Sequence, residues 1–291
     1  MKLIIISGRS GSGKSTAIQV LEDLGYYCID NLPTDLLLHT TDYLINSADA
    51  CHDKIALCID ARNASGKLDE LAGILRKIQD QYSDIEVDFI YLDTSDEVLI
   101  QRFSATRRRH PMDAHASGLN EAIVLENEIL APLSDMASLR VDTTRMSLYE
   151  LRDVIKVRVC ERRQQSLSLQ FTSFGFKYGV PLDSDIVYDL RILPNPYWVP
   201  ELRHYNGTEQ PIVEFLSRQT DVCEMVDDIK GYLEKWLPHF KDNNRRYVTV
   251  ALGCTGGHHR SVFVAEKLAA HFNASMDSIS LSHRELGPVH P

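Results

Sequence analysis

The sequence predicts a two-domain α/β protein whose first domain is built on a parallel sheet. Three observations support this prediction. Strand-like apolar runs alternate with helix-like segments over residues 2–92, and a glycine-rich turn follows the first run. Near residue 165 the periodic pattern of apolar residues gives way to a stretch with fewer periodic segments. A length of 291 residues also suits two domains at roughly 150 residues each.

The first domain, residues 1–165, alternates strands with helices. Apolar residues at helical spacing predict helices that include 14–24, 35–46, 67–80 and 96–107. Ser147 and Glu150 form a capping-box pattern that opens a further helix. The expected strands are 3–6, 26–29, 55–59, 87–92 and 139–143.

The second domain, residues 166–291, has fewer periodic segments. Residues 171–210 hold four of the eleven prolines and several aromatic residues, which predicts that loops dominate there. Farther along, we expect a helix over 212–237, a strand over 247–252 and a helix over 261–272.

The composition excludes several classes of protein. Apolar residues make up 44% and charged residues 25% of the chain, which excludes disordered, collagen-like and coiled-coil proteins. No apolar run approaches the ~18 residues of a membrane span. The six cysteines contain no C-x-x-C pair, so we expect a reduced, cytoplasmic protein. A net charge of −10 argues against nonspecific nucleic-acid binding, although a local basic patch remains compatible with it.

The strongest motif follows the first expected strand. It matches the P-loop pattern G-x-x-x-x-G-K-[ST] and opens a helix, which is the context that this motif requires. Its glycines let backbone N–H groups face an anion, while Lys14 would reach the β- and γ-phosphates and Ser15 would ligate Mg²⁺. The motif therefore predicts a nucleoside triphosphate site at Gly8, Arg9, Ser10, Gly11, Ser12, Gly13, Lys14 and Ser15.

A P-loop is usually accompanied by a carboxylate that ends a neighbouring strand and orders water around Mg²⁺. Asp30, Asp60 and Asp93 are the three candidates. We favour Asp60 because it ends the most continuous apolar strand, and Ala61-Arg62-Asn63 follows it with donors and acceptors that suit a nucleotide. Asp30 lies in a turn that would face a second substrate. Each of the three also fits a helix cap or a turn residue.

The densest basic cluster consists of Arg102 and the run Arg107-Arg108-Arg109-His110-Pro111. In P-loop kinases, a mobile lid that carries arginine neutralises charge on the transferred phosphoryl group. Contact with RNA also fits, because arginine forks onto phosphates and stacks on bases. A solvated helix end is the third reading.

A second candidate site runs from Gly253 to Ser261. It too follows an apolar strand and opens a helix, and its Cys254-x5-Arg260 spacing matches the phosphate loop of cysteine phosphatases. An anion site is a safer reading than a catalytic Cys254, since position 253 is not the histidine that such phosphatases usually have. Asp189 is the only general acid that we can suggest, and a purely structural loop is the third alternative.

Together these segments resemble the RapZ (YvcJ-like) family. The resemblance covers roughly residues 1–272 and rests on Gly8–Ser15, Tyr27–Pro33, Asp60–Asn63, Thr106–Pro111, Phe174–Lys177, Leu193–Pro196 and Gly253–Ser261. It implies a P-loop kinase-like domain with an ATP site at residues 8–15 and a guanine-nucleotide motif at Asp60–Asn63. It also implies a second α/β domain that resembles a phosphofructokinase half.

The resemblance implies functions as well. Members of the family hydrolyse ATP and GTP weakly, and enteric members act as RNase adapters that present a small regulatory RNA to an endoribonuclease. The second domain would bind an amino-sugar phosphate or another small anion, and we expect a homo-oligomer. The residues expected to form this phosphosugar site are Tyr197, Asn243, Thr255, Gly256, Gly257, His259 and Arg260.

Two departures from the family pattern stand out. Residues 273–291 lack the Lys/Arg-rich tail of the enteric members, and Tyr197 stands where the family usually has histidine. Any RNA contacts would therefore come from Arg107–Arg109, from residues 156–163, or from Lys241, Arg245 and Arg246.

The leading interpretation is a nucleotide-binding regulatory protein with slow NTPase activity and an anion-sensing second domain. The alternatives are a small-molecule kinase with Asp30 as the base, a phosphatase at Cys254, and a pure RNA adapter.

Overall fold

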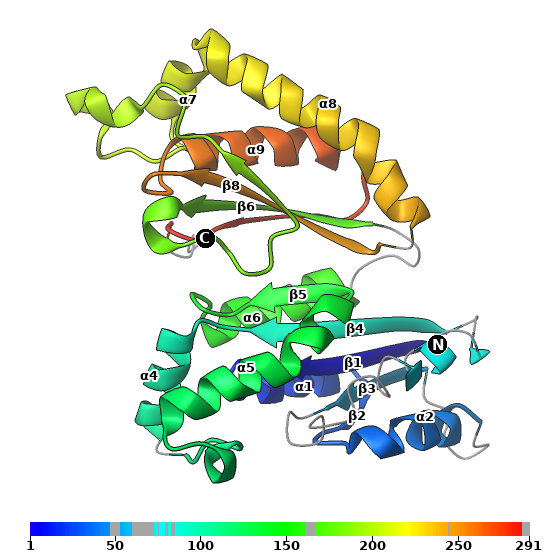
Figure 1. The fold of residues 1–291 in the computed structure, drawn as a ribbon. Helices are drawn as coiled ribbons and strands as arrows, with labels where there is room; N and C mark the ends of the chain where they lie inside the picture. The colour runs from blue at the N-terminus through cyan, green and yellow to red at the C-terminus, as the bar shows by residue number, and fades with distance from the viewer. Residues whose placement is uncertain are drawn as a thin grey trace. The chain divides into compact units, whose positions relative to one another are not determined.

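A computed structural model of the chain (Figure 1) shows two compact units, Met1–Cys160 and Glu161–Pro291. The structure describes residues 1–46, 53–59, 73–74, 76–78, 81–82, 85–106, 108–160, 167–243 and 245–286. Most of the helix expected over 67–80, the motif Asp60–Asn63 and Arg107 lie outside these residues. The expected α/β class with parallel strands is confirmed in both units.

Unit 1 contains a five-stranded sheet in which every strand pair is parallel. The order across the sheet is β2-β3-β1-β4-β5. Each strand expected in this part of the sequence is present, because buried apolar runs mark the strands of a parallel sheet clearly. Their bounds are β1 (Lys2–Gly8), β2 (Tyr27–Ile29), β3 (Lys54–Cys58), β4 (Glu86–Asp93) and β5 (Leu139–Asp142).

Helices cover both faces of this sheet. Leu3 and Ile5 of β1 face a core that also contains residues of α2 and α5, whereas α1 and α6 pack together on the other face. The capping box of Ser147 and Glu150 is formed as predicted, but α5 was not expected from the sequence. The helices are α1 (Lys14–Asp23), α2 (Leu37–Asn46), α4 (Asp96–Thr106), α5 (Leu119–Met136) and α6 (Leu148–Val154); α6 continues as a π-helix over Ile155–Cys160, and 3-10 turns span Thr34–Leu36 and Asp113–His115.

Unit 2 contains a four-stranded parallel sheet in the order β7-β8-β6-β9. The strands are β6 (Ser168–Gly175), β7 (Ile186–Asp189), β8 (Tyr247–Cys254) and β9 (Ile279–His283). The helices are α7 (Gln210–Ser217), α8 (Thr220–Asp242) and α9 (Arg260–Asn273), with 3-10 turns at Phe176–Tyr178, Pro196–Trp198 and Pro200–Leu202.

The structure of unit 2 adds to the sequence expectations and corrects one of them. The helix expected over 212–237 is two helices, because the chain breaks at Arg218 and Gln219. Loops and 3-10 turns dominate residues 171–210 as expected, but this stretch also includes most of β6 and all of β7, and β9 was not predicted. In β6, buried Gln170 and Thr172 hydrogen bond to Ser282 of β9, so this strand lacks the continuous apolar run of a typical central strand.

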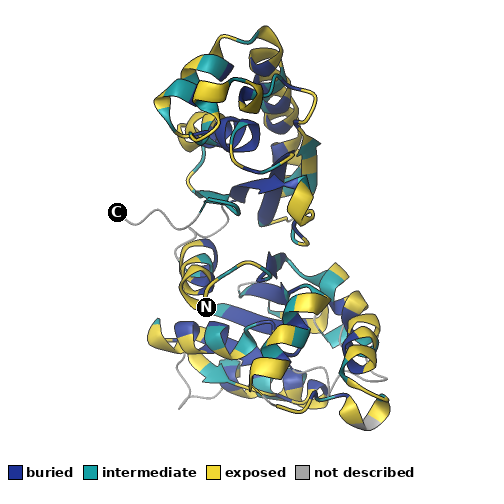
Figure 2. Cartoon of the chain, turned by 90° about the vertical axis from the view of Figure 1, so that its left-hand side faces the viewer, coloured by how far each residue is buried: buried dark blue, intermediate teal, exposed yellow. Residues whose placement is uncertain are grey.

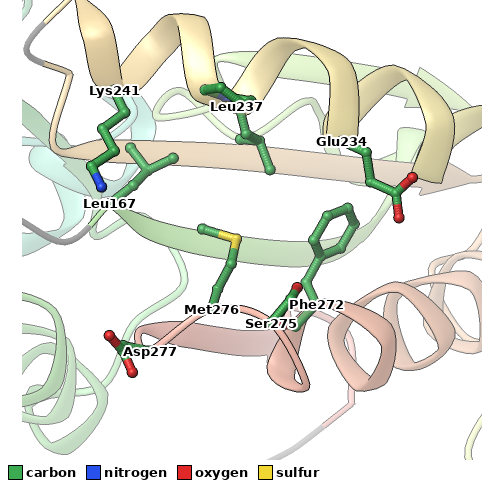
Figure 3. A pocket seen from close by; sticks show the side chains of 9 residues that line it. Leu167, Glu234, Leu237, Lys241, Phe272, Ser275, Met276 and Asp277 are labelled. Atoms are coloured by element: carbon green, nitrogen blue, oxygen red, sulfur yellow. Dashed lines mark hydrogen bonds between the residues drawn. The ribbon is translucent and has the colours of Figure 1, made fainter.

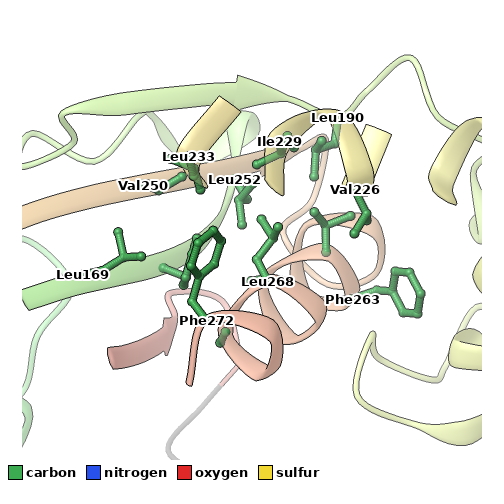
Figure 4. Close-up of a cluster of buried hydrophobic side chains, with 14 of the residues drawn as sticks. Leu169, Leu190, Val226, Ile229, Leu233, Val250, Leu252, Phe263, Leu268 and Phe272 are labelled. Carbon is green, nitrogen blue, oxygen red and sulfur yellow. The ribbon is translucent and has the colours of Figure 1, made fainter. Parts of the chain in front are cut away.

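The core of unit 2 lies between its sheet and the helices α8 and α9 (Figures 1 and 4). Leu169 of β6 and Val250 of β8 face Leu268 and Phe272 of α9, and the rings of Phe171 and Phe272 stack 5.8 Å apart. Figure 2 shows the central strands of both units as buried. Within the described ranges, no helix is long and apolar enough to cross a membrane.

Candidate functional site

The P-loop forms a tight turn between β1 and α1. Gly8 has φ 146°, and a Cβ atom there would lie 2.2 Å from the carbonyl oxygen of Leu92 on β4. Gly13 has φ 106°, and its Cβ would lie 2.7 Å from the side chain of Leu151. Both positions therefore require glycine, which lets the loop pass closely between its neighbours.

The inner side of this loop presents backbone donors. In the described part of the chain, the N–H groups of Gly11, Gly13, Lys14 and Ser15 make no hydrogen bond. These groups surround the N-terminus of α1, where the helix dipole adds partial positive charge. Lys14 Nζ donates to the carbonyl oxygens of Gly8 at 2.7 Å and Arg9 at 3.1 Å, so this ammonium lies across the loop.

Arg9 points away from this concave side. Its side chain is buried, donates to the carbonyl oxygens of Thr94 and Ile123 at 3.1 Å each, and pairs with Asp96 at 2.6 Å. Arg9 therefore contributes its backbone to the P-loop, while its guanidinium ties the loop to α4 and α5.

A pocket of about 740 Å³ opens beside the P-loop. It brings together three segments that the sequence analysis selected separately: the P-loop, the turn at Asp30 and the basic cluster. The described residues that line it are Ser10, Gly11, Gly13, Lys14, Ser15, Thr16, Asp30, Asn31, Cys58, Arg102, Phe103, Thr106, Arg108, Arg109 and Pro111.

The candidate carboxylates occupy different places. Asp30 is exposed on the pocket wall. Asp93 turns back on its own strand end, where it accepts a hydrogen bond from the N–H of Thr94 at 2.7 Å, and burial raises its pKa. Asp60 lies outside the described residues. Beside Asp30, burial and then the charge of this aspartate raise the pKa of Cys58 to about 12, so that thiol stays protonated at neutral pH.

The basic cluster divides into two parts with different roles. Arg102 donates to the carbonyl oxygens of Gly11 at 2.9 Å and Thr143 at 2.8 Å, and burial lowers its pKa. It therefore braces the P-loop while lining the pocket. Arg108 and Arg109 follow the end of α4, are exposed and line the pocket, and their side chains make no hydrogen bond or ion pair with the described residues.

Two supporting residues were absent from the sequence predictions. The hydroxyl of Thr143 lies 2.9 Å from the carbonyl oxygen of Ser12. Glu126 of α5 accepts the N–H of Ser10 with both carboxylate oxygens, each at 3.0 Å. A signal for Glu126 was present, since it lies on the same helical stripe as the buried residues Ala122 and Leu130.

The second candidate loop follows β8 in unit 2. Cys254 is buried, its Sγ accepts the N–H of Gly257 at 3.2 Å, and the hydroxyl of Ser261 lies 3.2 Å from the same sulfur. The loop packs closely on β6, because a Cβ on Gly175 would lie 2.7 Å from the backbone of Gly256. The thiol thus sits inside the turn of the loop as a structural hydrogen-bond partner.

Arg260 supports the same loop from within. It is buried, and its Nη1 donates to the carbonyl oxygens of Arg191 and Leu193, both at 2.9 Å. Its Nη2 lies 3.5 Å from the hydroxyl of Thr255, and burial lowers its pKa. The backbone therefore occupies Nη1, while Nη2 lies beside Thr255 of the expected anion site.

Residues 203–207 of unit 2 contact both the backbone beside His259 and the ring of Tyr197. Gly207 donates its N–H to the carbonyl oxygen of His258 at 2.8 Å, and burial lowers the pKa of His259, which favours a neutral ring at pH 7. Tyr197 is half exposed, and the guanidinium of Arg203 lies 5.1 Å from the centre of its ring.

Two other predicted residues take different positions. Asn243 caps the end of α8 before β8 begins, whereas the loop follows β8, so one strand length of roughly 25 Å separates them. Asp189 forms an ion pair with Arg191, whose hydrogen bonds lower the pKa of this carboxyl. A carboxylate held ionised is a poor proton donor, so the general acid that a phosphatase needs is missing from this position.

The basic residues near 241–246 lie away from the Cys254 loop. Lys241 borders a pocket of about 460 Å³ between α8, the end of α9 and residues 275–277 (Figure 3). Arg245 pairs with Asp185 at 2.6 Å. These residues lie before β8, at the amino end of the strand whose carboxyl end carries the Cys254 loop.

Comparisons with known proteins cover both units. The RapZ-like N-terminal domain matches residues 1–163, and the RapZ C-terminal domain matches residues 167–287. A nucleotide-binding protein from Hahella chejuensis is 49% identical over 286 residues, which cover 98% of this chain and 99% of that protein. One from Marinobacter nauticus is 50% identical over 287 residues, covering 98% of this chain and 97% of that protein.

Among solved structures, a shikimate kinase from Acinetobacter baumannii aligns with a TM-score of 0.38 and 15% identity, covering 56% of this chain and 95% of that chain. The two domain matches account for nearly the whole chain in the order in which the units occur. With identity near one half over almost the full length of its relatives, the chain belongs to the RapZ family.

Proposed function

We propose that unit 1 binds a nucleoside triphosphate with Mg²⁺ at the P-loop pocket. One observation carries the proposal: unpaired backbone N–H groups of the P-loop and the cationic side chains of Lys14, Arg108 and Arg109 surround the same pocket of about 740 Å³. Such a site suits a polyphosphate, because oriented N–H groups and a helix N-terminus favour negative charge. The names of the relatives, which are nucleotide-binding proteins, agree with it.

The proposal extends to both ATP and GTP, and to slow hydrolysis. The family resemblance supports ATP at residues 8–15 and the guanine-nucleotide motif at Asp60, Ala61, Arg62 and Asn63. Asp30 is the one carboxylate among the described residues that line the pocket, so few groups there could activate an attacking water. We therefore expect turnover to be weak.

Mg²⁺ would enter with the nucleotide. In P-loop proteins the loop serine and the phosphate oxygens are ligands of this ion, and Ser15 is exposed on this pocket. Among the described residues no three His, Cys, Asp or Glu side chains gather to hold a metal ion alone, which fits a metal held jointly with its nucleotide. Asp60 is the carboxylate that we propose as its second protein contact.

Calorimetry with Lys14→Ala tests nucleotide binding. Losing a charge-assisted phosphate contact should weaken the binding of Mg·ATP and Mg·GTP by about 1.5–3 kcal/mol, or one to two decades. Lys54→Ala is a matched control, because Lys54 begins β3, whose far end carries Cys58 on the pocket. If both variants bind nucleotide like the parent protein, the proposed site is wrong.

A small-molecule kinase is the second candidate for unit 1. The exposed position of Asp30 in the pocket would let it accept a proton from an acceptor hydroxyl. Transfer of labelled γ-phosphate to a panel of metabolites, lost in Asp30→Asn with ATP affinity retained, would favour this activity over a purely regulatory role.

For unit 2 we propose binding of a phosphorylated small molecule, an amino-sugar phosphate by family resemblance, at the Cys254–Arg260 loop. Within the described residues, the N–H groups of Gly256, His258 and His259 make no hydrogen bond, and they lie just before α9. Titration with glucosamine 6-phosphate should give saturable binding that Thr255→Val weakens. Phosphate release that is abolished by Cys254→Ser would instead indicate a phosphatase.

The RNase-adapter role, the homo-oligomer and the cytoplasmic location are proposed from the family resemblance. RNA affinity measured against salt tests the first, with each phosphate contact contributing ~0.7–0.9 to the slope. Replacing Lys241, Arg245 and Arg246 together should lower that slope. Arg245 should contribute least, because Asp185 already neutralises it. Light scattering measures the oligomer.

A further inference from the structure

Glu126 is a carboxylate in the interior of unit 1. Its side chain is 0% exposed, and it lies on the buried face of α5. Both oxygens lie 3.0 Å from the N–H of Ser10, the third residue of the P-loop motif. Burial alone would raise the pKa of Glu126, but the neighbouring His110 and the N–H of Ser10 stabilise the ionised carboxylate and outweigh burial, so that the pKa lies below its ordinary value.

His110 approaches the same carboxylate from the other side. Its Nδ1 accepts the N–H of Met112 at 3.2 Å, which places the proton of a neutral ring on Nε2. That Nε2 lies 3.3 Å from Oε2 of Glu126, close enough for charge attraction but outside hydrogen-bond geometry. The His110 side chain is fully buried. The two buried groups therefore face each other at 3.3 Å without a well-aligned hydrogen bond.

These two contacts join two segments that line the nucleotide pocket. Ser10 belongs to the P-loop, and His110 belongs to the segment Arg108–Pro111, which we call the arginine loop. Arg108, Arg109 and Pro111 line the nucleotide pocket, and a second pocket of about 390 Å³ lies against the same arginines and His110. Glu126 itself is not among the residues that line the nucleotide pocket. It can act on a nucleotide only through these two loops.

We propose that Glu126 is a positioning residue that sets the spacing between the P-loop and the arginine loop, with His110 as its partner. This inference rests on the proposed nucleotide function. When Arg108 and Arg109 move toward a bound triphosphate, Nε2–H of His110 completes its hydrogen bond to Oε2 of Glu126, while Ser10 stays fixed on the same carboxylate. The buried pair thereby holds the arginine loop near the phosphates.

A double-mutant cycle tests the pairing. Glu126→Gln keeps the volume and an acceptor for Ser10 but removes the charge, and His110→Phe keeps a ring against Phe103, whose ring centre lies 4.8 Å away, but removes the donor. Each single variant should bind Mg·ATP with about ten-fold lower affinity, since charged hydrogen bonds are roughly twice as strong as neutral ones. The affinity of the double variant for Mg·ATP should be no lower than that of the single variant that binds more weakly. His110→Gln, which retains a donor, should stay within about three-fold of the parent protein.

A second readout needs no nucleotide. Trypsin can cleave after Arg108 and Arg109 when the arginine loop opens away from the rest of unit 1. Glu126→Gln and His110→Phe should therefore speed this cleavage, and their effects on the rate should again not be additive. Leu130→Val is the matched control: it lies one turn farther along the buried face of α5 and weakens packing without touching either loop.

The outcomes separate the two hypotheses. If the parent protein binds no nucleotide but the cleavage cycle is coupled, the proposed function fails and the positioning role stands. The positioning role is wrong in two cases. In the first, nucleotide binds but the effects of Glu126→Gln and His110→Phe multiply in the double variant. In the second, Leu130→Val produces the same effects.

Discussion

Replacing Arg9 with alanine should destabilise unit 1, although Arg9 lies within the P-loop motif. The carbonyl oxygen of Thr94 would lose its donor, whereas that of Ile123, inside α5, would lose one donor and keep its bond within the helix; both residues are essentially unexposed. A buried acceptor left unpaired costs about 1–3 kcal/mol. The Asp96 side chain is 52% exposed, so the lost ion pair adds at most about 1 kcal/mol. We therefore expect a loss of about 2–4 kcal/mol, or about 1–2 M in urea midpoint at an m-value of roughly 2 kcal/mol/M.

Two optical signals make the assay specific. Both tryptophans, Trp198 and Trp236, belong to unit 2, so their fluorescence follows that unit, whereas far-ultraviolet circular dichroism follows the helices of both. The dichroism transition of Arg9→Ala should begin at lower urea, with the fluorescence transition as internal reference. Asp96→Asn, which removes only the exposed side of the pair, should shift it much less. An unchanged dichroism midpoint, with nucleotide binding lost as in Lys14→Ala, would refute this reasoning and make Arg9 a ligand.

Three further predictions concern both units. The pKa of Glu126 in the folded protein lies below its ordinary value, so its charge stabilises unit 1 above about pH 4.3. This contribution is lost as the pH falls through the pKa of the folded state. Below about pH 4.3, the dichroism midpoint in urea should therefore fall more steeply in the parent protein than in Glu126→Gln. Deleting residues 273–291 removes β9 and should lower the fluorescence midpoint, whereas ending the chain at Leu286 should not. Arg260→Ala should lower the same midpoint by unpairing two carbonyl groups, while Cys254→Ser, whose hydroxyl can occupy the same hydrogen bonds, should lower it less.

The sheet of unit 1 was predictable because its strands are buried apolar runs. Leu3 to Ile6 are all unexposed in β1, and such runs need no knowledge of their neighbours to be recognised. Unit 2 was less predictable because its strands depend on each other. Ser282 of β9 and Gln170 of β6 are polar residues that the interior tolerates only because they hydrogen bond across the pair. A partner 112 residues away supplies the reason for each.

The candidate site shows the same division. The P-loop, Asp30 and the arginines could be selected by residue type, since their chemistry is local, and the pocket brings all three together. The anion site of unit 2 was harder to delimit. Asn243 has a suitable side chain, but the length of β8 separates it from the loop, and Arg260 directs two of its hydrogen bonds at backbone carbonyls.

The motif predicts the class of ligand, but other elements determine the shape of the loop that binds it. Arg9 is held by the carbonyl oxygen of Ile123 and Ser10 by the carboxylate of Glu126, so α5 anchors two successive residues of the P-loop. Each anchor is more than a hundred residues away along the chain, and α5 reaches the loop only because the sheet order places β1 beside β4. A glutamate on the apolar face of a helix is therefore a signal worth following: burial makes an unpaired carboxylate costly, and its partner here is the backbone of the functional loop.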